Sequence, residues 1–387
     1  MMDADVIVVG GGVIGTAIAW RAAAGGRSVT LIDPDTDDKA SLVAAGMLGP
    51  VSESVFGEQD LLALNLHAVD RFPAFNAELE AASGLQTGLR TEGTLAVAYD
   101  SGDLAALDRL TEFRHSIGLK AERLDARACR KLEPFLAPST RGGVLATGDL
   151  SVDNRRYLAA LRAAAAAAGV QTVVGHATQV AAGRVRFRVS PAGETVAAGE
   201  TVEMSAGQVV VAAGWATGRI EGLPDGIRKA IRPVKGQILR LRHPGNLPHI
   251  ISHTVRAMVQ GRDIYLVPRA DGELVVGATQ EERDDLDITA GAVHDLLRDA
   301  MTAVPAISEL ILAEASAGRR PGTSDNGPIL GPVPPAGPIG DPRLIIAAGH
   351  FRNGVLLSAV TADAVAALLA DGEPHQAWTP FNPGRLT

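Results

Sequence analysis

The pattern of hydrophobic and polar positions at the start of the chain predicts a strand, a turn, a helix and a second strand in direct succession. An apolar run at 6–9 leads into the glycine turn GGGVIG at 10–15, and a nearly uncharged helical segment covers 13–24. A second apolar run begins at Val29 and ends in Asp33. This is the order of a βαβ unit that binds a dinucleotide.

Each residue type in this turn meets a requirement of a bound diphosphate. Gly10 permits a tight turn, Gly12 lets the backbone approach the phosphates, and Gly15 lets the helix pack closely on the strand. The positive end of the helix attracts the phosphates, and Asp33 can reach ribose hydroxyls. A glycine turn without a ligand is the alternative, but the full succession of strand, turn, helix, strand and acid favours a nucleotide.

Beyond this unit the pattern alternates between long helices and short strands. Asp153 is placed to cap a helix that begins at Asn154. We expect helices at 58–82, 103–117, 125–131, 154–168, 290–303 and 355–369. We expect strands at 89–98, 142–146, 170–174, 177–180, 184–189, 200–204, 208–214, 233–241, 250–252, 256–259, 264–267, 273–276 and 344–347, and a Pro/Gly loop at 330–342.

This order predicts an α/β (α+β) fold with two domains, because 387 residues is long for a single core. A Rossmann-like nucleotide domain would be assembled from three segments, at 1–85, 146–220 and 320–387. The β-rich blocks at 86–145 and 221–319 would form a substrate-binding domain with flanking helices.

Composition narrows the class of protein. The net charge is −8 and no dense Lys/Arg run is present, so we expect no nucleic-acid partner. The apolar stretch 6–20 lacks the preceding positive charge of a signal peptide and is too short to cross a bilayer, so we expect no membrane partner. Cys129 is the single cysteine, which excludes a disulfide within the chain. We therefore expect a cytoplasmic protein in which Cys129 is not catalytic. We expect no metal site.

The segment at 344–358 carries a second informative motif. A buried strand meets Gly349 and Gly354 and then enters a helix whose free N–H groups can stabilise a developing negative charge. A reduced flavin carries such a charge, whereas a nicotinamide does not. An ordinary strand, turn and helix would give the same pattern, so this motif alone does not decide the function.

Arg319 and Arg320 precede a Pro-Gly turn and form the third motif. A guanidinium is a planar fork that suits a carboxylate, the group that every amino acid presents. Solvated surface arginines are the alternative. Adjacent residues of an extended strand point to opposite faces, so only one of the two can face a site.

Taken together, seven motifs resemble the FAD-dependent D-amino-acid-oxidase-like family, in particular its glycine oxidase branch, which serves thiamine biosynthesis. The resemblance covers essentially the whole chain. Its markers lie at 10–15, 44–49 with Glu53, 233–237, 265–269, 275–279, 317–325 and 348–357.

The resemblance implies a non-covalently bound FAD. It places Asp33 at the adenosine ribose, Val180 near the adenine, and residues 350–356 around the flavin pyrimidine. The full set of implied cofactor residues is Gly10, Gly12, Val13, Ile14, Gly15, Asp33, Pro34, Ala40, Ser41, Ala45, Gly46, Met47, Val180, Gly214, His350, Phe351, Arg352, Asn353, Gly354, Val355 and Leu356.

The resemblance also implies a substrate site. Arg320 would grip the substrate carboxylate, helped by the Tyr265 hydroxyl and with Arg352 close by, and these three are the implied catalytic residues. Gln280 and Gly49 would complete the pocket, and Gln280 departs from the methionine that glycine oxidases can carry there. Arg319 is expected to point to solvent.

The implied reaction is FAD-dependent oxidative deamination of glycine, small amines or D-amino acids by hydride transfer. Its products are an imine or oxo acid, ammonia and hydrogen peroxide, with molecular oxygen as co-substrate. The resemblance further implies a homo-oligomer that hands its imine to a thiazole synthase. A sarcosine oxidase and a D-amino-acid oxidase or dehydrogenase of the same family remain alternatives. A non-catalytic flavin-binding subunit is disfavoured, because it would not need a carboxylate clamp.

Overall fold

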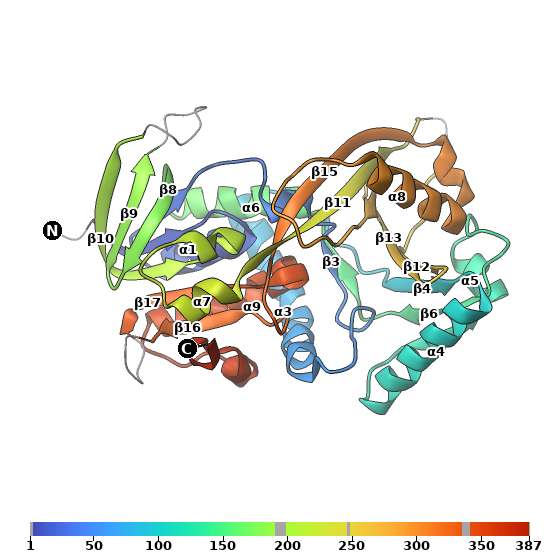
Figure 1. The fold of residues 1–387 in the computed structure, drawn as a ribbon, viewed down its shortest axis with the longest axis horizontal. Coiled ribbons are helices and arrows are strands. Elements are labelled where there is room, and N and C mark those ends of the chain that lie inside the picture. The colour runs from blue at the N-terminus through green and yellow to red at the C-terminus, as the bar shows by residue number, and fades with distance from the viewer. Residues whose placement is uncertain (1–2, 190–198, 246–247, 335–340, 387) are drawn as a thin grey trace.

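The computed structural model describes residues 3–189, 199–245, 248–334 and 341–386. Its strands form a seven-stranded sheet and an eight-stranded sheet, with a two-stranded pair between β3 (Met47–Leu48) and β7 (Leu150–Ser151). In Figure 1 the seven-stranded sheet lies to the left and the eight-stranded sheet to the right. The predicted α/β class is confirmed.

The seven-stranded sheet has a parallel centre. β1 pairs in parallel with β2 and with β10, and β10 pairs in parallel with β17. The other strands extend it, with antiparallel pairing at β9 and β16. Its strands are β1 (Ala4–Val9), β2 (Val29–Asp33), β8 (Gln171–Ala181), β9 (Arg184–Val189), β10 (Thr201–Val211), β16 (Ile329–Val333) and β17 (Asp341–Ala348).

Both faces of this sheet are buried, which explains the continuous apolar run of β1. Val6 and Val8 belong to a core cluster with helices on one face, whereas Ile7 and Val9 belong to a cluster on the other. The helices of the first face pack on one another: α1 (Val13–Ala24), α3 (Gln59–Ser83), α6 (Asn154–Ala167) and α9 (Gly354–Leu369). On the other face lies the short α7 (Asp225–Ala230), which contributes Ile227.

The eight-stranded sheet is mostly antiparallel and is flanked by helices on both of its faces (Figure 1). Its strands, in spatial order, are β15 (Ile311–Gly322), β11 (Arg232–Arg242), β14 (Leu274–Gly277), β13 (Arg262–Pro268), β12 (Thr254–Val259), β4 (Thr94–Ala98), β6 (Gly142–Ala146) and β5 (Glu122–Asp125). The associated helices are α4 (Ser101–Ser116), α5 (Ala126–Leu132) and α8 (Ala290–Ala303). The remaining helix, α2 (Ala40–Val43), follows the first βαβ unit.

The predicted helices are confirmed with small shifts at their ends, but some of the predicted strands need correction. The strand expected at 89–98 is shorter and covers only Thr94–Ala98, β4. The Asp153 side chain accepts hydrogen bonds from the backbone N–H groups of Arg155 and Arg156, so the predicted cap is confirmed. The two strands expected between 170 and 180 are one continuous strand, β8, and those expected between 200 and 214 are likewise one strand, β10. No strand forms at 250–252, which lies among bends and turns.

The expected Pro/Gly loop at 330–342 also needs correction. Its first part is strand β16, which tolerates prolines because it pairs only with β17, at the edge of the sheet. Its last residues belong to β17, and residues 335–340 lie outside the described residues.

The predicted domain boundaries stay a prediction, supported by the origin of the strands. All strands of the seven-stranded sheet come from 1–85, 146–220 and 320–387. The eight-stranded sheet draws on the other two segments, except that β15 runs three residues past 319 and β6 ends one residue past 145.

Among the described residues, Phe351–Leu369 is the one helical segment long and apolar enough to cross a membrane, and 67% of it is buried inside the fold. Its residues contact α1 and α3 in the core of the seven-stranded sheet. Burial on the sheet accounts for its composition, as expected for a helix that is apolar all round.

Gly15 gives a test of how tightly α1 packs on its glycine turn. A Cβ at Gly15 would collide with the Gly10 carbonyl oxygen, whereas one at Gly148 would meet no atom within 4 Å. Gly15→Ala should therefore lower the free energy of unfolding by about 1–3 kcal/mol. Denaturant unfolding of Gly15→Ala and of the control Gly148→Ala measures this, and equal midpoints for the two variants would refute the packing argument.

Candidate functional site

A cavity of about 480 Å³ lies between the two sheets and draws its lining from both. The volume is in the range of ligand pockets, about 300–1,000 Å³. From the seven-stranded sheet come the carboxyl ends of β1 and β2, the place where open parallel sheets bind ligands. From the other sheet come residues of β11, β12, β13 and β15.

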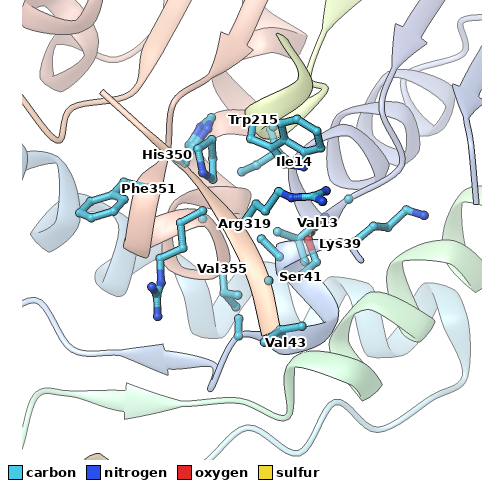
Figure 2. Close-up of a pocket in the computed structure, with 18 of the residues that line it drawn as sticks. Val13, Ile14, Lys39, Ser41, Val43, Trp215, Arg319, His350, Phe351 and Val355 are labelled. Atoms are coloured by element: carbon cyan, nitrogen blue, oxygen red, sulfur yellow. Dashed lines mark hydrogen bonds between the residues drawn. The ribbon is translucent and has the colours of Figure 1, made fainter. Parts of the chain in front are cut away.

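The glycine turn forms one wall of this cavity. Gly10 has a φ of +103°, and a Cβ there would lie 2.5 Å from the Ala212 carbonyl oxygen, so glycine is required. The Val13 N–H donates to the Ser41 hydroxyl over 3.0 Å, and both residues line the cavity (Figure 2). The amino end of α1 therefore faces the cavity, as a diphosphate requires.

Asp33 stands at the end of β2 with its carboxylate in the cavity wall. It accepts a hydrogen bond from the Gly11 N–H over 2.5 Å and lies 2.9 Å from the Lys39 ammonium. A buried carboxylate at this strand end is the acceptor that ribose hydroxyls need.

The carboxyl end of β17, at the same edge of the parallel sheet, contributes the turn between β17 and α9. His350 is buried, and its Nε2 lies 3.0 Å from the Thr361 hydroxyl. Burial lowers the pKa of His350 to about 3, so the imidazole is neutral near pH 7. Gly354 and Val355 begin α9 at the cavity wall, which brings the positive end of its helix dipole to the site.

Most of the cofactor residues implied by the sequence line this cavity. They are Gly10, Gly12, Val13, Ile14, Asp33, Pro34, Ala40, Ser41, Ala45, Gly46, Met47, Gly214, His350, Phe351, Arg352, Gly354 and Val355. Their roles toward a cofactor stay predictions. The lining also includes Gly175, His176 and Ala177 of β8.

Five residues of the implied sets lie outside the lining: Gly15, Gly49, Val180, Asn353 and Leu356. Gly15 lies against the backbone of Gly10, and Gly49 lies beside the buried carboxylate of Asp149. Val180 belongs to the core cluster that contains Ile7, Val9 and Ile227. Asn353 and Leu356 are buried at the start of α9.

Strand pairing aligns the substrate half of the site. Tyr265 is in register with Gly277 on one side and Arg256 on the other, and Gly277 is in register with Ile238. Residues in register share a face of the sheet, and Ile238, Tyr265 and Arg256 all line the cavity. Their neighbours Leu266, Val255 and Val276 belong to the core on the opposite face.

Arg320 and Tyr265 depend on two glycines. A Cβ at Gly236 would collide with the Arg320 guanidinium, and a Cβ at Gly277 would collide with the Tyr265 hydroxyl. The Arg320 Nη1 donates to the Thr279 carbonyl over 3.1 Å. Burial raises the pKa of Tyr265, and Arg320 beside it opposes that rise, so the phenol is protonated at neutral pH.

Two other cavity arginines are paired with glutamates. Arg256 lies 2.8 Å from Glu53 and Arg352 lies 2.7 Å from Glu58. Arg320 has no carboxylate within 4.0 Å among the residues the structure describes, which leaves its charge available to a ligand. The expected role of Arg352 beside a substrate stays a prediction, and its guanidinium is bound by Glu58.

The expectation that Arg319 points to solvent is wrong. Its side chain is 16% exposed and lies 2.8 Å from Asp38 and 3.1 Å from Asp284. Its guanidinium also stacks on Trp215, 4.5 Å from the ring centroid, and Figure 2 shows the two side by side in the cavity. The opposite face of β15 is covered by other parts of the chain, so Arg319 meets these partners and not water.

Sequence reasoning also missed Trp215, Lys39, His176 and the pair Glu53–Arg256, all of which line the cavity. The sequence indicates Glu53 only as part of a motif. Its partner is 203 residues away, and no local signal connects the two. Cys129 is buried in the core of the eight-stranded sheet, where burial raises its pKa to about 11, as a non-catalytic cysteine requires.

Comparison with known proteins agrees with this geometry. A family model described as FAD-dependent oxidoreductase matches residues 5–368. The chain belongs to the FAD-dependent oxidoreductase family. FAD is therefore its cofactor, and the glycine turn, the α1 amino end and Asp33 fit the adenosine diphosphate moiety. No cluster of three or more potential metal ligands occurs in the described part of the chain.

Individual relatives narrow the comparison. Glycine oxidase of Geobacillus kaustophilus is 33% identical over 385 residues, which cover 98% of this chain and 96% of that protein. The crystal structure of glycine oxidase from Geobacillus kaustophilus has a TM-score of 0.85 and 31% identity, covering 99% of this chain and 98% of its own. The bifunctional protein ThiO/ThiG of Synechocystis is 31% identical over 388 residues. This chain spans about half of that protein, 54% of its length.

The partners of Arg319 predict a role in holding FAD. Arg319→Ala removes two charged contacts and the stacking on Trp215, so we expect the Kd for FAD to rise by about tenfold, equivalent to about 1.4 kcal/mol. Titration of the apoprotein by flavin fluorescence measures this.

Arg219 provides the matched control. It also stacks on Trp215 and pairs with Asp284, but its side chain is 63% exposed and does not line the cavity. Arg219→Ala should leave the Kd for FAD nearly unchanged. Equal effects of the two variants on the Kd for FAD would mean that stacking on Trp215 stabilises the segment around Trp215 and does not hold the cofactor directly.

Proposed function

We propose that this protein oxidatively deaminates glycine, and with it small amines or D-amino acids. The supporting observation is Arg320, the cavity arginine whose charge no described carboxylate neutralises. It lies beside the protonated Tyr265, so a guanidinium and a phenol converge on one point of the cavity. This pair suits the carboxylate of an amino acid.

Arg320 acts by orientation. A charged contact to the carboxylate would fix the Cα of the substrate in one position, which reduces the entropy lost on reaching the transition state. The Tyr265 hydroxyl would donate a second hydrogen bond to the same carboxylate. FAD, when bound, supplies the acceptor for the hydride of Cα and passes both electrons to oxygen, giving hydrogen peroxide.

Two groups near this point that could act as a general base are already engaged by other residues. Glu53 is paired with Arg256, and the neutral His350 faces Thr361. The amine would therefore arrive deprotonated, and its lone pair would form the imine as the hydride leaves. Water then converts the imine of glycine to glyoxylate and ammonia.

The wider setting is part of the same proposal. Relatives named ThiO/ThiG support hand-off of the imine to a thiazole synthase in thiamine biosynthesis. We also propose that the protein is a homo-oligomer in the cytoplasm and that oxygen is its electron acceptor. The second candidate is a sarcosine oxidase, or a D-amino-acid oxidase or dehydrogenase. It is favoured by Gln280, an exposed residue that gives the cavity lining a polar side chain.

Oxygen uptake by the purified yellow protein tests the activity. We expect consumption with glycine, and stoichiometric glyoxylate and peroxide. A faster reaction with sarcosine or a D-amino acid would favour the second candidate. Reduction of an artificial acceptor without oxygen uptake would identify a dehydrogenase.

Arg320→Ala tests the carboxylate contact. We expect kcat/KM for glycine to fall by the equivalent of about 2–5 kcal/mol while FAD binding is retained. Arg320→Lys keeps the charge but loses the planar fork, so its kcat/KM should fall between those of the wild type and Arg320→Ala. A wild-type kcat/KM in FAD-saturated Arg320→Ala would contradict the assignment.

We also predict that FAD is held without a covalent bond. The cavity lining contains no cysteine among the described residues, and Cys129 lies in the core of the other sheet. Acid precipitation should therefore release the yellow colour into the supernatant. Colour that stays with the pellet would contradict this.

A further inference from the structure

The pair Glu53–Arg256 lies on the far side of Tyr265 from Arg320. Strand register puts Arg256 on β12 next to Tyr265 on β13, whereas Arg320 comes from β15, beyond β14 and β11. All four side chains line the same cavity. A ligand held by Arg320 and Tyr265 therefore extends toward a second arginine.

That second arginine is already neutralised. The Glu53 carboxylate accepts a hydrogen bond from Arg256 Nη1 over 2.8 Å, and the Glu53 and Arg256 side chains are 13% and 24% exposed. A charge pair this poorly hydrated is screened little by solvent, and it repels an additional anion placed against Glu53.

A further arginine, Arg114, holds the segment that carries Glu53. Arg114 is buried and donates to the Ser52 carbonyl and the Ser54 hydroxyl on either side of Glu53 in sequence. Burial and, to a smaller extent, the nearby charge of Arg256 together lower the pKa of Arg114 to about 10. Arg114 does not line the cavity, so Arg256 is the guanidinium that removal of Glu53 would make available to a ligand.

We propose that Glu53 is a specificity-determining residue that restricts the site to amines carrying a single carboxylate. By occupying Arg256 it removes the partner that a second carboxylate, on the nitrogen or on the side chain, would need. It also adds a repulsive charge, which is how binding sites reject unwanted ligands. This inference rests on the proposed function for the nature of the substrate.

Two ether acids test it without turnover. Methoxyacetate has one carboxylate, diglycolate has two, and neither has an amine to oxidise. Their Kd values for the FAD-loaded protein can be measured from the change in flavin absorbance. In the wild type diglycolate should bind more weakly than methoxyacetate. Glu53→Gln keeps the shape of the side chain and removes its charge. In this variant the Kd of diglycolate divided by the Kd of methoxyacetate should fall by about tenfold or more relative to the wild type.

The double variant Glu53→Gln/Arg256→Gln is the matched control. It removes both charges, so the gain for diglycolate should disappear. The proposal is overturned if wild-type protein binds both acids equally, if Glu53→Gln does not change the ratio, or if the double variant keeps the gain.

Turnover separates this inference from the proposed function. The ratio of kcat/KM for N-carboxymethylglycine to kcat/KM for sarcosine should be about tenfold higher in Glu53→Gln than in the wild type. A wild type that oxidises no amine would refute the proposed function, while the ratio of Kd values would still decide the role of Glu53.

Discussion

The close approach of the Arg320 guanidinium to the backbone at Gly236 is the contact on which the substrate half of the cavity depends. β11 and β15 pair in antiparallel register from Arg232↔Gly322 onward, with Gly236 opposite Gly318. A side chain at Gly236 would push Arg320 out of its place, and one at Gly277 would do the same to Tyr265. These two glycines hollow the face of an otherwise well-filled sheet, so a rigid scaffold positions the polar groups.

Charge pairing then decides which of the cavity arginines can act on a ligand. Coulomb interactions are strong where side chains are shielded from water, so an unpaired guanidinium in the cavity wall is costly unless an anion joins it. Glu53 and Glu58 neutralise Arg256 and Arg352, whereas Arg320 has no carboxylate partner among the described residues and donates to the Thr279 carbonyl. The arrangement concentrates the attraction for an anion at one point, next to the phenol of Tyr265.

Local patterns predicted the parts of the fold in which neighbours in sequence are neighbours in space. The βαβ unit, the Asp153 cap and the helices belong to this class, since period, glycine spacing and capping residues are all read within a few turns. The strands joined as β8 and β10 were missed because long-range pairing overrides the local break in apolar pattern. The family resemblance supplied most of the residues that line the cavity, but not their partners.

The partners could not be predicted because they depend on register between distant segments. Arg256 of β12 meets Glu53, which lies between β3 and α3, only in the assembled fold. Arg319 likewise meets Asp38 and Trp215 only when β15 crosses between the two halves of the cavity. The alternation of a strand had indicated that Arg319 and Arg320 face opposite ways, but not that both faces are covered.

This covering gives β15 a double role. On one face Arg320 belongs to the substrate half, and on the other Arg319 packs on Trp215 beside the nucleotide half. A shift of β15 by one residue would exchange the two side chains and disturb both halves together. The long ladder with β11 fixes that register, so the strand that presents the carboxylate-binding arginine also fixes where substrate lies relative to cofactor.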